Sequence, residues 1–342
     1  MLTKTVRFAA IGLNHAHIYG QTNLLLRAGA ELVSFYAAEP DLAAQYGHVY
    51  PQATQVSDPR AIFEDPSIHL IISAAIPDER APIGIAAMRH GKDYMADKPG
   101  FTTLAQLEEA RRVQAETGRI YSVCFSERFE NAATVRAGEL VRSGAIGTVV
   151  HTIGLGPHRV NLTARPPWFF QRSRFGGIIN DIGSHQADQF LFFTGATRAE
   201  VVTAQVANYR HPQYPQFDDF GDVLLRGVTP EGLEVSGYIR VDWYTPDGLG
   251  TWGDGRLIVL GTEGYLEVRK NIDIAGRSGG NHLFLVDQKG THYIDCRDVT
   301  LPYGPGLVYD ILHRTETAMP QEHCFLASEL VLRAEEAAHR LK

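Results

Sequence analysis

The first third of the chain alternates short apolar segments with helical patterns that end at glycine, and this rhythm restricts the fold more than any other feature. The helices end at Gly29, Gly91 and Gly118, where glycine readily adopts the left-handed conformation of a C-cap. Such alternation is typical of βαβ units around a parallel sheet. The sequence therefore predicts an α/β domain over residues 1–125, with strands at 6–11, 31–37, 69–75, 93–96 and 119–125.

From residue 126 onward the pattern changes to that of a mainly antiparallel sheet. Helices are predicted over 130–143 and 181–194, and glycines follow polar residues at several turns, as hairpins with positive φ require. We predict a second, α+β domain over residues 126–342 with an open-faced sheet, and an amphipathic helix 322–341 that packs back on the body. Its strands are predicted at 148–155, 200–210, 219–226, 233–243, 256–261 and 265–269, with later ones near Leu283 and Tyr293.

Charge and cysteine content exclude several classes of partner. The chain has 32 Lys and Arg against 39 Asp and Glu, a net charge of −7, and therefore no basic surplus for nucleic acid or an anionic membrane. Cys124, Cys296 and Cys324 form no C-x-x-C pair, so a reducing compartment fits better than a disulfide framework. The N-terminal residues do not match a secretory signal, and no apolar run approaches about 18 residues. We predict a cytoplasmic protein.

The first strand runs into residues 12–17, which read G-L-N-H-A-H and precede a helix. In dinucleotide-binding folds this turn holds the pyrophosphate against backbone N–H groups and the helix N-terminus. Only the first glycine of G-x-G-x-x-G is present, because Asn14 and His17 occupy the other two positions. Side chains here can supply phosphate hydrogen bonds in place of the missing glycine geometry. The predicted coenzyme contacts of this turn are Gly12, Asn14, His15 and Ala16.

Glu39 follows the second strand, where a carboxylate can accept hydrogen bonds from the adenosine ribose and disfavour a 2′-phosphate. This position favours NAD over NADP, and the alternative is that Glu39 only opens a solvated turn before Pro40. His15 and His17 form an H-x-H pair, but two imidazoles without a third ligand nearby in the sequence are poor evidence for zinc. We therefore predict no metal site.

Two later segments place reactive side chains at positions suited to chemistry. Lys98 follows an apolar strand at the edge where α/β sheets bind ligands, and it contacts a ligand or extends its amine to solvent. Asp181 and His185 are four residues apart, so on one helix they share a face, and both point at a substrate or Asp181 orients His185. The alternatives are an aspartate that interacts with the helix dipole and a core histidine.

These three segments, in this order, resemble the glucose-fructose oxidoreductase, inositol dehydrogenase and rhizopine-catabolism (Gfo/Idh/MocA) family over nearly the whole chain. Residues 97–99, Asp-Lys-Pro, are similar to the family's Glu-Lys-Pro, and residues 176–188 to its G-G-x-x-x-D-x-G-x-H-x-x-D segment. The resemblance implies a Rossmann domain, a sheet domain with substrate between the two, and a homodimer or homotetramer formed through that sheet. Ala75 and Pro77 stand in the strand ending where the family more often has Thr-Pro-Asn, and with Glu39, Lys98 and Pro99 they complete the predicted coenzyme contacts.

Carried over to this sequence, the resemblance implies that Lys98 binds the reacting hydroxyl, Asp181 holds the substrate or the histidine, and His185 removes the hydroxyl proton. Arg128 and Trp168 are further predicted substrate contacts. The implied activity is NAD-dependent oxidation of a secondary hydroxyl of a sugar, inositol or related polyol. Two alternatives remain open: an enzyme that keeps NAD bound and uses transient oxidation for elimination or glycoside cleavage, and a non-catalytic sensor of coenzyme or sugar.

Overall fold

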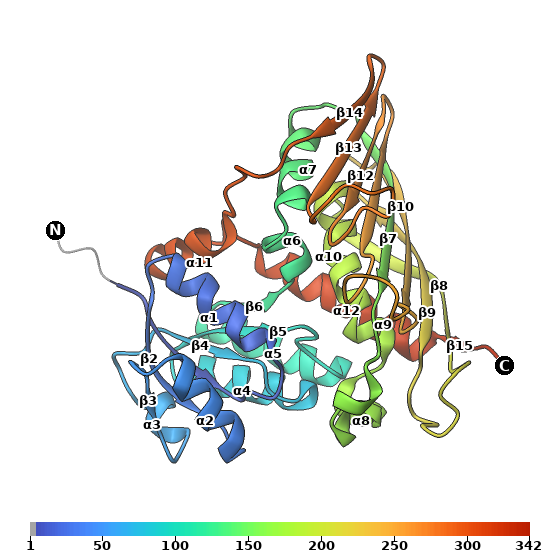
Figure 1. Cartoon of the computed structure of the whole chain (residues 1–342). Helices are drawn as coiled ribbons and strands as arrows, with labels where there is room; N and C mark the ends of the chain where they lie inside the picture. The colour runs from blue at the N-terminus through green and yellow to red at the C-terminus, as the bar shows by residue number, and fades with distance from the viewer. Residues whose placement is uncertain (1–4) are drawn as a thin grey trace. The chain divides into compact units, whose positions relative to one another are not determined.

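A computed structural model describes residues 5–342, and the chain forms two compact units (Figure 1). The first unit contains the described residues up to Cys124 together with Ser173–Gly176 and Pro302–Phe325. The second contains Phe125–Arg172, Gly177–Leu301 and Leu326–Lys342. Residues 1–4, with which the predicted first domain begins, lie outside the described residues.

The first unit is built on a six-stranded parallel sheet with the strand order β3-β2-β1-β4-β5-β6. The predicted parallel sheet is confirmed. Strands β4 and β5 are buried along their whole length; β4 is an apolar run, whereas β5 has a buried aspartate at each end. The short strand β3 lay outside the prediction. The strands are β1 (Arg7–Ile11), β2 (Glu31–Tyr36), β3 (Thr54–Gln55), β4 (Leu70–Ser73), β5 (Asp93–Asp97) and β6 (Tyr121–Cys124).

Helices of the first unit connect these strands. Gly118 ends α5 in the predicted left-handed conformation with φ of 62°, and Thr103 caps its start by accepting a hydrogen bond from the Gln106 N–H at 3.2 Å. The helices are α1 (His17–Arg27), α2 (Pro40–Val49), α3 (Arg60–Phe63), α4 (Pro77–Arg89) and α5 (Leu104–Thr117).

The segment 302–325 belongs to the first unit because its side chains pack there. Its helix α11 (Tyr303–His313), which the sequence did not predict, lies against α1, and the Tyr303 hydroxyl hydrogen-bonds Ser122 of β6. Arg314, just after α11, forms two hydrogen bonds of 2.8 and 2.6 Å with Asp93 of β5. These contacts explain why a late stretch of chain joins the Rossmann-type sheet.

The second unit is built on a nine-stranded sheet with the order β14-β13-β12-β11-β7-β10-β9-β8-β15. Strand β7 lies inside it, parallel to β10 and antiparallel to β11, and most other neighbours are antiparallel. The predicted mainly antiparallel sheet is confirmed. The strands are β7 (Val149–Pro157), β8 (Arg198–Ala207), β9 (Phe220–Val228), β10 (Glu234–Asp242), β11 (Arg256–Gly261), β12 (Tyr265–Arg269), β13 (His282–Asp287), β14 (Gly290–Ile294) and β15 (His339–Arg340).

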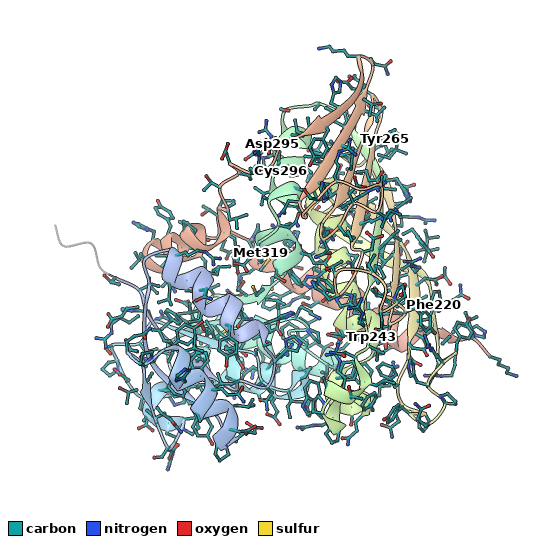
Figure 2. All side chains as sticks on the ribbon, in the orientation of Figure 1. Phe220, Trp243, Tyr265, Asp295, Cys296 and Met319 are labelled. Atoms are coloured by element: carbon teal, nitrogen blue, oxygen red, sulfur yellow. The ribbon has the colours of Figure 1, made fainter. Side chains whose placement is uncertain are left out.

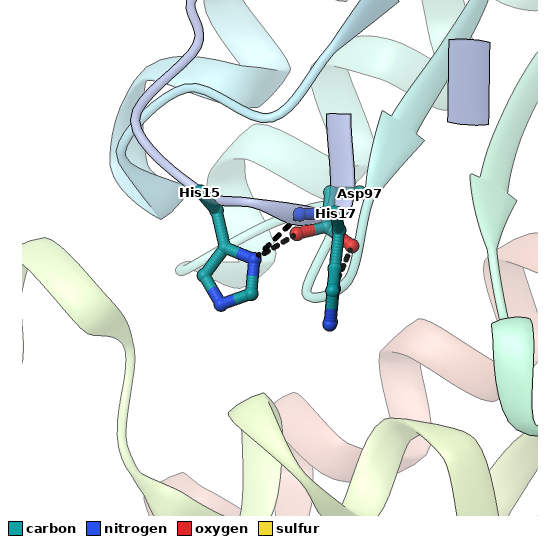
Figure 3. Close-up of side chains that lie close together, drawn as sticks. All are labelled: His15, His17 and Asp97. Carbon is teal, nitrogen blue, oxygen red and sulfur yellow. Dashed lines mark hydrogen bonds and ion pairs between the residues drawn. The ribbon is translucent and has the colours of Figure 1, made fainter. Parts of the chain in front are cut away.

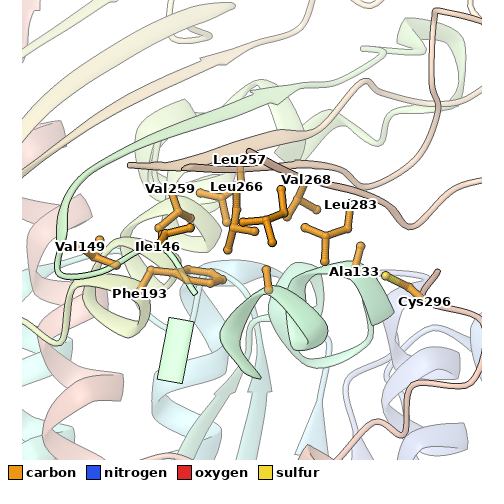
Figure 4. Close-up of a cluster of buried hydrophobic side chains, with 12 residues drawn as sticks. Ala133, Ile146, Val149, Phe193, Leu257, Val259, Leu266, Val268, Leu283 and Cys296 are labelled. Atoms are coloured by element: carbon orange, nitrogen blue, oxygen red, sulfur yellow. The ribbon is translucent and has the colours of Figure 1, made fainter. Parts of the chain in front are cut away.

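Helices α7 (Ala132–Arg142) and α10 (Gly183–Thr194) pack on one face of this sheet. Their buried side chains meet alternate residues of β11, β12 and β13 in an apolar core that includes Phe193, Leu257 and Leu266 (Figure 4). On the same sheet Leu260 and Tyr265 are 42% and 40% exposed, as expected for positions that alternate with buried ones. Tyr265 is labelled at its place in the sheet in Figure 2. The sheet therefore has one covered face and one partly apolar open face.

Two predicted helices have different limits in the structure. The helix predicted over 181–194 is broken at Ile182 into α9 (Ile178–Asp181) and α10. The last helix, α12 (Gln321–Ala337), ends before 341 because β15 pairs with β8. The remaining short helices are α6 (Ser126–Phe129), η1 (Leu162–Ala164), η2 (Pro167–Phe170) and α8 (Arg172–Phe175). Within residues 5–342, no helix combines the length and apolarity needed to cross a membrane.

Candidate functional site

The turn after β1 requires glycine at position 12. Gly12 has φ of +78°, and a Cβ there would lie 2.4 Å from the Cβ of Ala75, much closer than two carbon atoms can approach. The Gly12 N–H donates to the Tyr36 carbonyl at 3.0 Å, and the His15 N–H donates to the Ala74 carbonyl at 2.9 Å. The structure thus brings two predicted coenzyme residues, Gly12 and Ala75, into direct contact at the carboxyl edge of the sheet.

Asn14 and Glu39 also lie together at this edge. The Asn14 side-chain amide donates a hydrogen bond of 2.7 Å to Glu39 Oε1, and Glu39 is the residue that precedes α2. The contact shows that Glu39 is attached to the turn rather than only opening a solvated loop. An ionised carboxylate has about four acceptor positions, so Glu39 retains capacity for ribose hydroxyls.

Asp97, the last residue of β5, connects two histidines of the turn (Figure 3). Asp97 Oδ1 lies 2.9 Å from His17 Nδ1, and Asp97 Oδ2 lies 3.6 Å from His15 Nδ1. Burial acts to raise the pKa of Asp97, but His17 and then Arg80 hold it well below its usual range. Burial and the neighbouring His17 lower the pKa of His15 well below 6.5, so His15 is a neutral imidazole near pH 7.

The same three side chains offer two imidazole nitrogens and a carboxylate oxygen within 4.8 Å of one another. The sequence had supplied no third ligand, and Asp97 fills that place because β5 ends beside the turn. However, Arg80 Nη2 lies 3.3 Å from Asp97 Oδ2, and the positive charges of Lys98 and Arg80 both act on His15. This positive surrounding disfavours a divalent cation. The arrangement fits a hydrogen-bonded network, and the absence of a metal stays a prediction.

Arg80, on α4, is a residue that the sequence analysis missed. Its side chain is 1% exposed, its Nε donates to the Ala75 carbonyl at 2.7 Å, and its Nη1 donates to the carbonyls of Lys98 and Pro99. It therefore fastens the chain beyond β4 to the chain beyond β5 and positions Lys98, which is 6% exposed and precedes a cis peptide bond to Pro99. Pro77 lies nearby in sequence as the first residue of α4, and Ala16 precedes α1.

The second unit contains the other two predicted catalytic residues. Asp181 ends α9, whereas His185 lies in the first turn of α10 and is 2% exposed. The helix predicted over 181–194 is interrupted at Ile182, so Asp181 and His185 belong to two consecutive helices, and Ile182 keeps right-handed helical backbone angles. Asp181 lies close enough to Arg165 for their charges to interact, and Arg165 stacks over the Phe169 ring at 4.3 Å.

Arg128 and Trp168 were predicted as substrate contacts. The Arg128 guanidinium donates hydrogen bonds of 2.7 and 2.6 Å to Asp188 and lies 4.3 Å from the Phe129 ring centre. Both groups of this ion pair are buried, which indicates a structural role for Arg128. Trp168 lies in η2, half-buried, with its ring centre 6.2 Å from that of Phe169.

A polar cluster in the second unit also escaped the sequence analysis. Lys270, just after β12, donates a hydrogen bond to Glu127 of α6, and Gln186 of α10 donates to the same Oε2 atom at 3.1 Å. His158, just after β7, lies with its ring 4.5 Å from that of Trp252. Glu127 and Lys270 are 143 residues apart, and only the fold brings them together.

The parallel sheet order, the glycine turn and the carboxylate after β2 define a dinucleotide-binding enzyme domain of the Rossmann type. Comparison with known families agrees: the model of an oxidoreductase family with an NAD-binding Rossmann fold matches residues 6–125. The model of the GFO/IDH/MocA C-terminal domain matches residues 134–267. The chain belongs to the GFO/IDH/MocA family of oxidoreductases.

Three individual proteins illustrate the similarity. An oxidoreductase structure from Erwinia carotovora atroseptica SCRI1043 is 45% identical with a TM-score of 0.94, covering 99% of this chain and 100% of that one. The scyllo-inositol 2-dehydrogenase (NAD(+)) of Bacillus subtilis is 25% identical over 91% of this chain and 85% of its own. The oxidoreductase YdgJ of Escherichia coli is 30% identical, and the match covers 56% of this chain and just over half of YdgJ, also 56%.

Proposed function

We propose that this protein is an NAD-dependent dehydrogenase that oxidises a secondary hydroxyl of a sugar, inositol or related polyol. The observation that carries the proposal is the position of Lys98 at the carboxyl end of β5, on the sheet edge that also holds the Gly12 turn. A cation beside a coenzyme turn is suited to stabilising negative charge on a reacting oxygen. The name of the Bacillus subtilis relative, an NAD(+)-dependent inositol dehydrogenase, supports both the coenzyme and the substrate class.

The residues of the turn fit a dinucleotide. At Gly12 there is no room for a Cβ, so the turn stays close to Ala75. At the third glycine position of the motif stands His17, whose side chain hydrogen-bonds Asp97. The residues that would hold NAD are those of the turn, with Glu39 on the adenosine ribose. When bound, NAD supplies the acceptor for the hydride.

The protein side chains would bind the substrate hydroxyl and accept its proton. Lys98 would bind the substrate hydroxyl and stabilise the alkoxide, and His185 would accept the hydroxyl proton. Loss of that proton is what allows hydride to leave the carbon. Asp181 would hold the substrate or orient His185. Lys98 belongs to the first unit, and Asp181 and His185 belong to the second.

The first experiment is a fluorescence titration with NADH and NADPH, followed by a screen of inositols and sugars for NADH production. We expect tighter binding of NADH than of NADPH because the Glu39 carboxylate disfavours a 2′-phosphate. Lys98→Ala and His185→Ala should each reduce kcat/KM by about 10² to 10⁴-fold while folding persists, and His185→Ala should also leave NADH binding unchanged. Lys289→Ala, which removes an exposed lysine at the β13–β14 turn, is the matched control.

Each outcome decides something specific. Unchanged turnover in Lys98→Ala and His185→Ala would refute the assignment of catalytic residues. NAD that stays bound through purification, together with products that accumulate without NADH, would favour transient oxidation. Coenzyme-dependent binding of a partner without turnover on any polyol would favour a sensor.

A further inference from the structure

The second unit buries a charged pair close to His185. The Lys270 amine donates to Glu127 Oε2, and the two side chains are only 2% and 8% exposed. The Gln186 amide donates to the same oxygen at 3.1 Å. A buried ion pair gives little net stability compared with an apolar pair of equal volume, because both charges lose their hydration. The pair is therefore expected to have a role other than stabilising the fold.

The pair is attached to the part of α10 that carries His185. Gln186, the next residue in that helix, is bonded directly to Glu127. On the other side, Phe125 precedes α6, and its ring centre lies 6.4 Å from that of His185 in an edge-to-face arrangement. The ion pair thus fixes the turn of helix on which the proposed base stands.

The charge of Glu127 acts on His185. Burial acts to raise the pKa of Glu127, but Lys270, then His185 and His158, lower it to about 2. Glu127 is therefore ionised at every pH where a histidine titrates. Because such coupling is mutual, a carboxylate stabilised by an imidazolium also stabilises that imidazolium.

Most other charges on elements around α10 are already paired. On α6, Arg128 pairs with Asp188, and on α7 Arg136 pairs with Glu139. On β10, Arg240 pairs with Asp242, while His151 of β7 hydrogen-bonds Ser236. The Arg142 guanidinium of α7 lies over the Phe192 ring. Glu127 interacts electrostatically with Lys270, His185 and His158, and Asp181 ends the short helix that precedes α10.

We propose that the buried Glu127–Lys270 pair positions His185 and sets the pH range over which it accepts the substrate proton. This inference rests on the proposed function. In the step itself the hydroxyl O–H bond breaks, an N–H bond forms on the His185 ring, and the hydride leaves the carbon for the nicotinamide, so that a carbonyl is produced. Glu127 keeps its charge throughout and stabilises the imidazolium, while Lys270 limits that effect.

The test is an NMR titration of the holoprotein labelled with ¹³C at histidine Cε1, because it reads His185 directly. The His185 signal is identified among the 14 histidines by its loss in His185→Gln. Glu127→Gln removes the negative charge but leaves an acceptor for Lys270, so the titration midpoint of His185 should fall by about one pH unit. The acidic limb of kcat/KM should move to lower pH by the same amount.

A charge-compensating variant separates electrostatics from structure. In Glu127→Gln/Lys270→Met neither charge remains, so the midpoint should rise again above that of Glu127→Gln, which a merely structural role would not cause. Glu139→Gln, in the exposed pair on α7, is the control and should leave the midpoint unchanged. A folded Glu127→Gln protein with an unmoved midpoint, or loss of folding in both variants, would overturn the proposal. If the midpoints shift as predicted but no polyol is turned over, the action of the pair on His185 is upheld and the proposed function is refuted.

Discussion

Removing the negative charge of Glu335, on α12, should raise the free energy of unfolding of the second unit. Its side chain is 4% exposed, and Arg172 Nη1, which lies 3.0 Å from it, is also 3.0 Å from Asp218. Arg340 also pairs with Asp218, at 2.6 Å, so Arg172 is the guanidinium that Glu335 and Asp218 share. Burial, opposed by Arg172 and reinforced by Asp218, raises the pKa of Glu335 from 4.5 to about 7.

The sign of the effect follows from the raised pKa. The folded protein binds this proton more tightly than the unfolded chain, so the associated stability is complete below pH 4.5 and is lost as the pH rises towards 7. A difference of about 2.5 units at 1.36 kcal/mol each gives about 3 kcal/mol. Glu335→Gln imitates the protonated side chain, so it should stabilise the protein by about 2 to 3 kcal/mol at pH 8 and by almost nothing at pH 4.

Urea unfolding at both pH values, followed by tryptophan fluorescence, measures this difference. The three tryptophans, Trp168, Trp243 and Trp252, all belong to the second unit, so their signal reports the unit that contains Glu335. Glu336→Gln, at the exposed neighbouring position, is the control and should change stability equally little at both pH values. An equal gain at pH 4 and pH 8, or a loss of stability at pH 8, would refute the reasoning.

Three further changes test other parts of the structure. Gly12→Ala should weaken NADH binding by at least about tenfold, because the new Cβ would clash with Ala75 and the backbone there has a positive φ. Titration calorimetry measures the affinity, and an unaltered affinity would contradict the geometry. Asp97→Asn leaves the buried Arg80 without its carboxylate and should cost about 3 kcal/mol or more in thermal unfolding, whereas an unchanged melting temperature would show that the ion pair is dispensable. If copies associate through the open face of the second sheet, Leu260→Glu should reduce the mass measured by light scattering, and an unchanged oligomer would exclude that face.

The parallel sheet could be predicted because inner strands such as β4 are buried on both faces and appear as apolar runs. The same reasoning placed Gly12 and Lys98 at strand ends, where the local sequence alone determines the position. It did not predict α11, whose packing against α1 depends on residues roughly 280 to 290 positions earlier. Periodicity reports local structure, whereas this docking is decided by tertiary contacts.

The polar contacts of the candidate site show the same limit. The sequence pointed to Asn14 and Glu39 separately, and the bond between them appears only when β1 and β2 are paired. Arg80 had no signal, because a single arginine in an amphipathic helix normally extends to solvent, whereas here it serves buried carbonyls. The Glu127–Lys270 pair joins α6 to the residue that follows β12, which no spacing rule covers.

The position of β7 inside the second sheet also determines when that sheet can form. Its two neighbours, β10 and β11, follow it by roughly 80 to 110 residues, so the strand has no partner while the intervening chain is being made. Sheets with pairings this distant close large loops before they gain contacts, and they fold slowly. Hairpins such as β11–β12 and β13–β14 can form early, but they have nothing to join until β7 is incorporated between β10 and β11. Assembly of this unit during synthesis is therefore held back by its own central strand.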